Sequence, residues 1–126
     1  MSPRASATAH ELSRIGLLAT LPGQTIARLA ARMTREDVAP GKAIVTEGET
    51  GDRFYVVLSG MLAVSQASRG PLGMLRPGEY FGEVGAAMGI PRTATVRALT
   101  PAVVASCDRQ TFDELLRPLF ADDSAG

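Results

Sequence analysis

This sequence is poor in the side chains on which several classes of protein depend. Its 126 residues include one cysteine, one histidine and no tryptophan, and its 13 basic and 13 acidic residues leave no net charge. A lone cysteine excludes a disulfide framework within the chain, which fits a reducing cytoplasm. Zero net charge argues against an electrostatic nucleic-acid binder, so we expect no direct contact with nucleic acid.

The same scarcity argues against a metal centre and against catalysis. A metal site needs several His, Cys or carboxylate ligands that converge on one point, and a Ser or Cys nucleophile needs a nearby base such as histidine. We interpret His10 as an exposed polar residue and Cys107 as a small hydrophobe at the end of a buried strand. We therefore expect a binding protein that uses no metal and is not an enzyme.

Long apolar runs are also absent. A membrane-spanning helix needs about 20 consecutive apolar residues, and stretches such as Phe54–Leu58 are far shorter. Yet 45% of the residues are apolar, which is enough for one ordinary hydrophobic core. We expect a single domain with no membrane span.

Helical patterns occupy the front of the chain. Residues 1–9 are predicted to form a flexible tail, and residues 10–33 two short amphipathic helices on either side of a break at Pro22 and Gly23. Thr20 is a candidate N-cap for the second helix. The apolar positions of these helices are Leu12, Ile15, Leu18, Leu21, Ile26, Leu29, Ala30 and Met33.

Between residues 34 and 107 the pattern changes to that of short strands. Apolar and β-branched runs alternate with Pro, Gly and Ser turn signals roughly every eight to twelve residues, which favours an all-β barrel or sandwich. Asp108 is then predicted to cap a helix over 108–120, closed near Pro118, before a flexible tail at 121–126. The expected strands are 36–38, 43–46, 54–58, 62–66, 72–75, 93–98 and 103–107.

The stretch FGEVGAAMGIPRTATV, residues 81–96, combines small residues with one acid and one base. Gly82 lets the backbone approach a ligand, and a short helix after it offers N–H groups, including that of Gly85, to an anion. Arg92 can bind two phosphate oxygens, and Glu83 can accept a hydrogen bond from a ribose hydroxyl. Phosphate and sugar together indicate a nucleotide. A purely structural salt bridge between Glu83 and Arg92 is the alternative.

These residues resemble the phosphate-binding cassette of the cyclic nucleotide-binding domain family. The family pattern is roughly F-G-E, a few small or apolar residues, a variable turn and P-R-[SAT]-A-T-V, and the resemblance continues upstream in EGETGDRFYVVLSG and LRPGEYFGE. It implies a mainly β fold with flanking helices, namely an eight-stranded jelly-roll barrel or double-stranded β-helix. The implied domain is 10–120, with the barrel at 34–107, the cassette at 81–96 and the C-terminal helix at 108–120.

The resemblance also implies a ligand, cAMP or cGMP, and no other cofactor. Alanine is common in the family at the position of Gly85, but glycine keeps the amide, so we expect no loss of function there. Thr93 permits cGMP without excluding cAMP. The implied ligand-binding residues are Gly82, Glu83, Val84, Gly85, Arg92, Thr93 and Ala94, and the candidates for the base and ribose wall are Val45, Val57, Leu72 and Met74.

The implied function is that of a cytoplasmic sensor, which we expect to be bacterial. It would pass its occupancy by cAMP, or else cGMP, to a C-terminal helix and to an effector domain or partner protein, and it could form a homodimer. In the family a further helix covers the base. Here we expect an excised module; the alternative is a complete small protein in which a partner or the Leu119–Phe120 pair acts as a cap. A ligand-free docking domain is the alternative, and the sensor part of a DNA-binding regulator is disfavoured.

Overall fold

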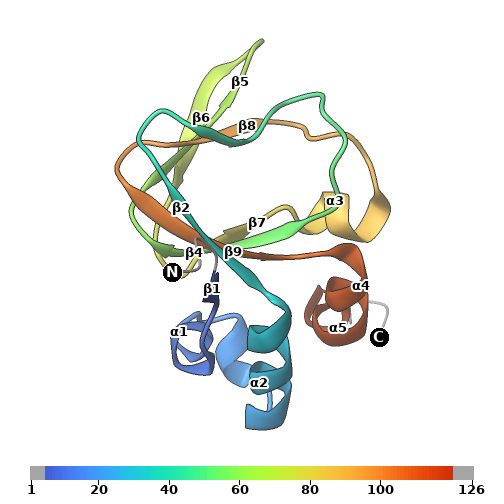
Figure 1. Cartoon of the computed structure of the whole chain (residues 1–126). Helices are drawn as coiled ribbons and strands as arrows, with labels where there is room; N and C mark the ends of the chain where they lie inside the picture. The colour runs from blue at the N-terminus through green and yellow to red at the C-terminus, as the bar shows by residue number, and fades with distance from the viewer. Residues whose placement is uncertain (1–4, 121–126) are drawn as a thin grey trace.

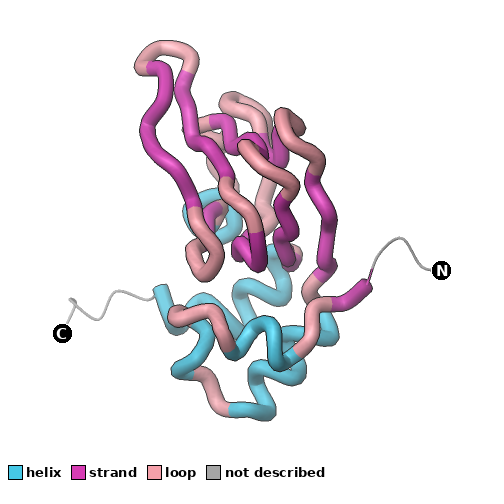
Figure 2. Tube along the Cα trace, turned by 90° about the vertical axis from the view of Figure 1, so that its left-hand side faces the viewer, coloured by secondary structure: helices cyan, strands magenta, loops and turns pink. Residues whose placement is uncertain are grey.

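A computed structural model describes residues 5–120 of the chain. Its strands form two antiparallel sheets, and most of its helices gather on one side of them (Figures 1 and 2). The five-stranded sheet has the order β1-β2-β9-β4-β7 and the four-stranded sheet the order β3-β8-β5-β6. Strands β2 to β9 form the eight-stranded jelly roll, which confirms the expected fold class. The strands are β1 (Ala5–Ser6), β2 (Thr34–Val38), β3 (Ala43–Val45), β4 (Phe54–Ser59), β5 (Leu62–Gln66), β6 (Gly70–Leu75), β7 (Tyr80–Phe81), β8 (Thr95–Ala98) and β9 (Ala102–Cys107).

An apolar core fills the space between the two sheets. Val57 of β4 pairs with Val104 of β9 in one sheet, and Leu62 and Val96 contribute from the other. All four side chains are at most 4% exposed. Alternate residues of each strand point to opposite faces, so the β-branched runs seen in the sequence supply this inner core.

A second core lies on the outer face of the five-stranded sheet, beneath the helices. Along β4, Phe54 and Val56 point to this side, because they alternate with the inward-facing residues. An ion pair of 2.6 Å between Arg32 and Glu114 also joins the front helices to the C-terminal one. The front helices are α1 (Ala9–Ser13), the short 3-10 helix η1 (Leu18–Thr20) and α2 (Gly23–Arg32).

The front of the chain differs from the expectation in two places. Within the expected tail, strand β1 pairs with β2; residues 1–4 of that tail, like the tail at 121–126, lie outside the described residues. The proposed cap Thr20 was wrong, because α2 begins only after Pro22, and the Thr20 hydroxyl donates instead to the Leu17 carbonyl at 3.3 Å. Thr8 caps α1, in a reciprocal capping box with Glu11.

The described C-terminal helix includes Pro118 and reaches Phe120, within the expected range 108–120. It comprises α4 (Arg109–Thr111), the wide π-helical turn η2 (Phe112–Leu116) and α5 (Arg117–Phe120). Asp108 caps it as predicted, since the Thr111 N–H donates to Asp108 Oδ1 at 2.9 Å. In a regular α-helix the ring of Pro118 would crowd the carbonyl four residues earlier. The wide turn contains that carbonyl and gives the ring room, so Pro118 fits inside the helix.

Candidate functional site

A cavity of about 330 Å³ opens beside α3 (Glu83–Met88), a volume within the usual range for small-molecule sites. Strand β7 leads into α3, and the loop after α3 leads into β8, so one continuous stretch of chain supplies most of the lining. The structure brings together all seven residues predicted to bind the ligand; their contact with a ligand stays a prediction. These are Gly82, Glu83, Val84, Gly85, Arg92, Thr93 and Ala94.

The guanidinium of Arg92 is held in place by its neighbours. Its Nη2 donates to the Arg53 carbonyl at 3.0 Å, and its Cζ lies 5.9 Å from the centroid of the Tyr55 ring. The Tyr55 ring in turn stacks on Phe81, with centroids 4.7 Å apart. Burial raises the pKa of the Tyr55 phenol above 10.0 although Arg92 and Arg53 oppose the shift, so the ring is neutral at physiological pH. The Tyr55 ring therefore offers Arg92 no negative charge.

The structural salt bridge between Glu83 and Arg92 is not formed. Within residues 5–120 neither side chain takes part in an ion pair. Both are half-buried and line the same cavity. A partly desolvated guanidinium without a counter-ion attracts an anion more strongly than one in bulk water. The pair therefore offers one cationic donor and one anionic acceptor to whatever enters.

Two glycines allow the close approach of chain segments around Arg92. Gly82 has φ +90°, and a Cβ there would lie 2.6 Å from the Arg53 carbonyl oxygen. A Cβ on Gly85 would lie 2.8 Å from the Gly51 carbonyl oxygen and 2.9 Å from Arg92 Nη1. Glycine at these positions lets the 51–53 loop and the start of α3 enclose the guanidinium.

The apolar wall of the cavity differs from the prediction. Val45 lines the cavity, but Val57 is fully buried in the core between the sheets, and Leu72 and Met74 are 45% and 49% exposed. Leu72 and Met74 point out of the roll because they alternate along β6 with inward-facing residues such as Leu75. The apolar residues that join Val45 in the lining are Val64, Leu75, Tyr80, Phe81, Ile90, Pro91 and Val96.

Residues distant in sequence fix the turn that carries Arg92, and the sequence analysis missed them. The Gly48 N–H donates to the Arg92 carbonyl at 2.8 Å, and the Arg92 N–H donates to the Glu49 carbonyl at 2.9 Å. Gln66 Nε2 donates to the Thr93 carbonyl at 2.7 Å. The upstream motif around residues 47–60 was the only signal for the first two contacts, and nothing in the sequence pointed to Gln66.

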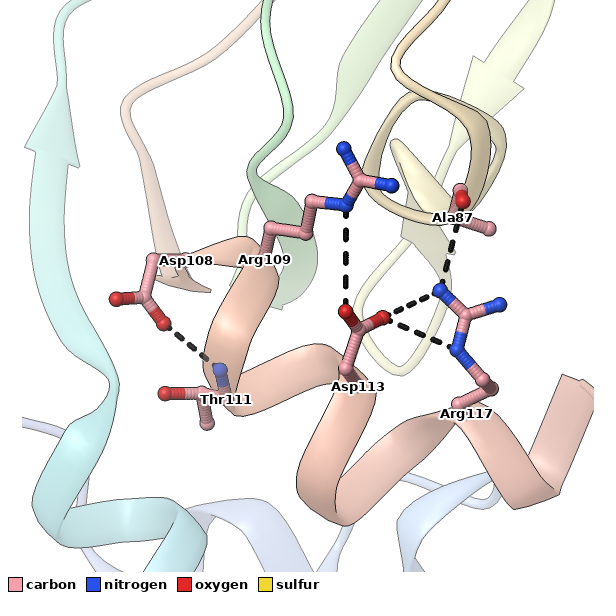
Figure 3. Close-up of polar contacts among 6 residues, drawn as sticks. All are labelled: Ala87, Asp108, Arg109, Thr111, Asp113 and Arg117. Atoms are coloured by element: carbon pink, nitrogen blue, oxygen red, sulfur yellow. Dashed lines mark hydrogen bonds and ion pairs between the residues drawn. The ribbon is translucent and has the colours of Figure 1, made fainter.

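The other end of α3 contacts the C-terminal helix (Figure 3). Arg117 Nη2 donates to the Ala87 carbonyl at 3.4 Å and forms an ion pair with Asp113. Asp113 Oδ2 also lies 4.0 Å from Arg109 Nε. Because cations near a helix C-terminus satisfy its free carbonyls, Arg117 ties the C-terminal helix to the end of α3.

Aromatic packing joins the cavity to the C-terminal helix at a second point. The ring of Phe120 lies edge-on to Tyr80 with centroids 5.4 Å apart, and Tyr80 lines the cavity. Phe120 also packs against Phe54 and Phe112 in the helix-side core. Phe120 is therefore part of a core and is not among the residues that line the cavity, so the structure does not place the Leu119–Phe120 pair as its cap.

The described residues contain no group of three or more His, Cys, Asp and Glu side chains that could hold a metal ion. Burial raises the pKa of the Cys107 thiol to about 12, so the thiol stays protonated and unreactive at neutral pH. His10 is exposed on α1. Over residues 5–120, every helix is too short or too polar to cross a membrane.

Comparison with known proteins defines the class to which this fold and site belong. Residues 35–118 match the family model of the cyclic nucleotide-binding domain. The chain therefore belongs to the cyclic nucleotide-binding domain family, and its cavity lies at the family's phosphate-binding cassette.

The chain is similar to regulatory subunits of protein kinases. A cAMP-dependent protein kinase regulatory subunit from Yarrowia lipolytica is 39% identical over 109 residues, which is 86% of this chain and 29% of the relative. The regulatory domain of Toxoplasma gondii PKA, solved with cAMP, is 27% identical with a TM-score of 0.81, covering 88% of this chain and 44% of that one. The regulatory subunit of a cAMP-independent protein kinase A from Trypanosoma brucei is 26% identical with a TM-score of 0.82, over 87% and 40%.

This chain spans less than a third of the curated relatives that it matches. Four of these relatives, from Yarrowia lipolytica, Debaryomyces hansenii, Candida albicans and Eremothecium gossypii, are fungal, and they do not support the expected bacterial origin.

Proposed function

We propose that the chain binds a cyclic nucleotide, with cAMP as the first candidate and cGMP as the second. The observation that carries the proposal is the half-buried Arg92, which lacks a counter-ion within residues 5–120 and shares its cavity with Glu83. The cyclic phosphate would supply the missing anion, and the ribose 2′-hydroxyl would donate to Glu83. The amides of Gly85, Thr93 and Ala94, all of which line the cavity, would complete the phosphate contacts.

The module would act as a sensor and not as an enzyme. Ligand at the cavity touches β7 and α3, and both contact the C-terminal helix, through Tyr80 to Phe120 and through Ala87 to Arg117. A ligand that prefers one arrangement of these contacts shifts the population toward it. The similar proteins are kinase regulatory subunits, which supports a kinase catalytic subunit as the kind of partner. A cytoplasmic location stays a prediction. Homodimerisation stays a prediction.

In a second candidate function the domain has the same fold but does not respond to cAMP. It is favoured by the similar subunit from Trypanosoma brucei, which is described as part of a cAMP-independent kinase. In this case the domain would serve as a docking module, or its cavity would take a different ligand.

Calorimetric titration of the chain with cAMP and with cGMP, beside thermal unfolding with each, tests the proposal. We expect saturable binding and a rise in melting temperature, since any ligand that prefers the native state stabilises it. Failure of both nucleotides at millimolar concentration to bind or to raise the melting temperature would contradict the proposed function and support the docking module.

A further inference from the structure

At the end of the ladder between β5 and β8, the two central strands of the four-stranded sheet, a side chain contacts the turn formed by Arg92, Thr93 and Ala94. Strand β5 pairs with β8 up to Ser65 and Thr95, and β8 begins at Thr95. Gln66 is therefore the first residue of β5 beyond this ladder. Its side-chain Nε2 reaches the carbonyl of Thr93 at 2.7 Å, so a side-chain amide supplies the donor that a longer strand would have supplied from its backbone.

The hairpin that carries Gln66 is itself tied to the same region. The next residue, Ala67, donates its N–H to Glu47 Oε1 at 2.8 Å, and the Glu47 N–H donates to Thr95 Oγ1 at 3.0 Å. The pairing of β5 with β6 shifts register between Val64 and Ser65, and such a bulge bends a hairpin locally. Three segments that are distant in sequence, around Glu47, Ala67 and Thr95, thus converge next to the turn that carries Arg92 and Thr93.

These contacts fix the direction of two peptide groups. In a trans peptide the C=O and the following N–H point in opposite directions. Gly48 holds the Arg92 carbonyl, which fixes the N–H of Thr93, and Gln66 holds the Thr93 carbonyl, which fixes the N–H of Ala94. Thr93 and Ala94 both line the cavity.

We propose that Gln66 is a positioning residue for the phosphate of the bound cyclic nucleotide, acting through the Thr93–Ala94 peptide without touching the ligand. The inference rests on the proposed function and adds a determinant outside the cassette. The partner is a carbonyl oxygen, so the side chain at this position must supply a donor: the amide of Gln66 does, whereas a carboxylate or a thioether offers none.

The test compares Gln66→Met, which keeps the length of the side chain and removes the donor, with Gln24→Met, a matched exchange on the exposed face of α2. Each protein is titrated with cAMP and with the Rp and Sp phosphorothioates of cAMP, which replace one or the other exocyclic oxygen. Losing one hydrogen bond is expected to weaken cAMP binding about three- to tenfold. The ratio of Sp to Rp affinity should move toward one, because the turn no longer distinguishes the two oxygens.

Several results would overturn the inference. Unchanged affinity in Gln66→Met, or an equal loss for all three ligands, would show that Gln66 only supports the fold. Should Gln66→Met not fold, Gln66→Glu, which keeps size and polarity but presents no donor to Thr93, must show the same change in the Sp to Rp ratio. Absence of binding by the parent protein would instead overturn the proposed function itself.

Discussion

The two ends of α3 each meet an arginine, and the two arginines have opposite surroundings. Arg92, at the start of the helix, lacks an acidic partner within residues 5–120 and faces a cavity. Arg117, at the other end, is paired with Asp113 and donates to a carbonyl of the helix. The same side chain thus completes the structure at one end and leaves a charge for a ligand at the other. The presence or absence of a counter-ion, more than the position of the arginine, therefore distinguishes a structural role from a binding role.

Replacing Arg92 should have the largest effect. Arg92→Ala removes a charge-assisted contact of ~1.5–3 kcal/mol to the phosphate, so cAMP affinity should fall at least about tenfold in calorimetry. Arg28→Ala, on the exposed face of α2, is the control and should bind like the parent. Equal affinity of Arg92→Ala and the parent would remove the distinction between the two arginines.

Gly82→Ala should affect both the fold and the site. Its φ of +90° disfavours any side chain, and the new Cβ would meet the Arg53 carbonyl oxygen at 2.6 Å. We expect a loss of roughly 1–3 kcal/mol in the free energy of unfolding, measured by urea titration, together with weaker cAMP binding. Gly23→Ala, where a Cβ meets nothing within 4 Å, is the matched control. If both variants are equally stable, α3 does not depend on the conformation of Gly82.

Asp108, which caps the C-terminal helix that carries Arg117, should make the stability of that helix depend on pH. Hydrogen bonds from the side chain and backbone of Thr111 lower the pKa of Asp108 below its usual 3.8. The charged carboxylate therefore stabilises the folded state above pH 3.8, and this contribution is lost as the pH falls through the lower folded-state value.

Asp108→Ala should cost about 1 kcal/mol of unfolding free energy near neutral pH. The difference from the parent should shrink as the pH falls below the usual carboxyl range, as measured by chemical denaturation. Asp37→Ala, on an exposed position of β2, should show no such convergence. A difference that stays constant down to pH 2 would contradict the assigned role of the cap.

Arg117→Ala should have the smallest effect. Its ion pair is exposed, and exposed pairs contribute roughly 0–1 kcal/mol. We expect a change in unfolding free energy within that range and a loss of cAMP affinity below about threefold, measured as for Arg92→Ala. A loss as large as that of Arg92→Ala would mean that the far end of α3 controls the site, and the contrast between the two ends would fail.

Local patterns in the sequence predicted most of this architecture. Seven strands, the cap at Asp108 and the cassette of small residues around Glu83 and Arg92 follow from periodicity, turn residues and the resemblance to the family. Thr20 failed as a cap because proline two residues later delays the start of α2. The helix expected over 108–120 is described as far as Phe120, and a wider helical turn accommodates the ring of Pro118.

The remaining features depend on contacts between segments distant in the chain. Leu72 and Met74 look like wall residues in a strand pattern, but only the pairing of β5 with β6 decides which face they occupy. The role that we propose for Gln66 depends on the fact that β5 extends one residue beyond the end of its ladder with β8. The sequence allows an ion pair between Glu83 and Arg92, but none forms within residues 5–120, because the fold decides how the two side chains are placed.

The hydrogen bond from Arg92 to the carbonyl of Arg53 has a consequence for the cost of recognition. A free arginine side chain loses up to about 2 kcal/mol of rotational entropy when it becomes fixed. Here that loss is incurred when the chain folds, so it does not reduce the affinity for an arriving nucleotide. The site is thus preorganised for the nucleotide that we propose, and the 51–53 loop, which lies outside the cassette, contributes to the expected affinity by holding Arg92 in place.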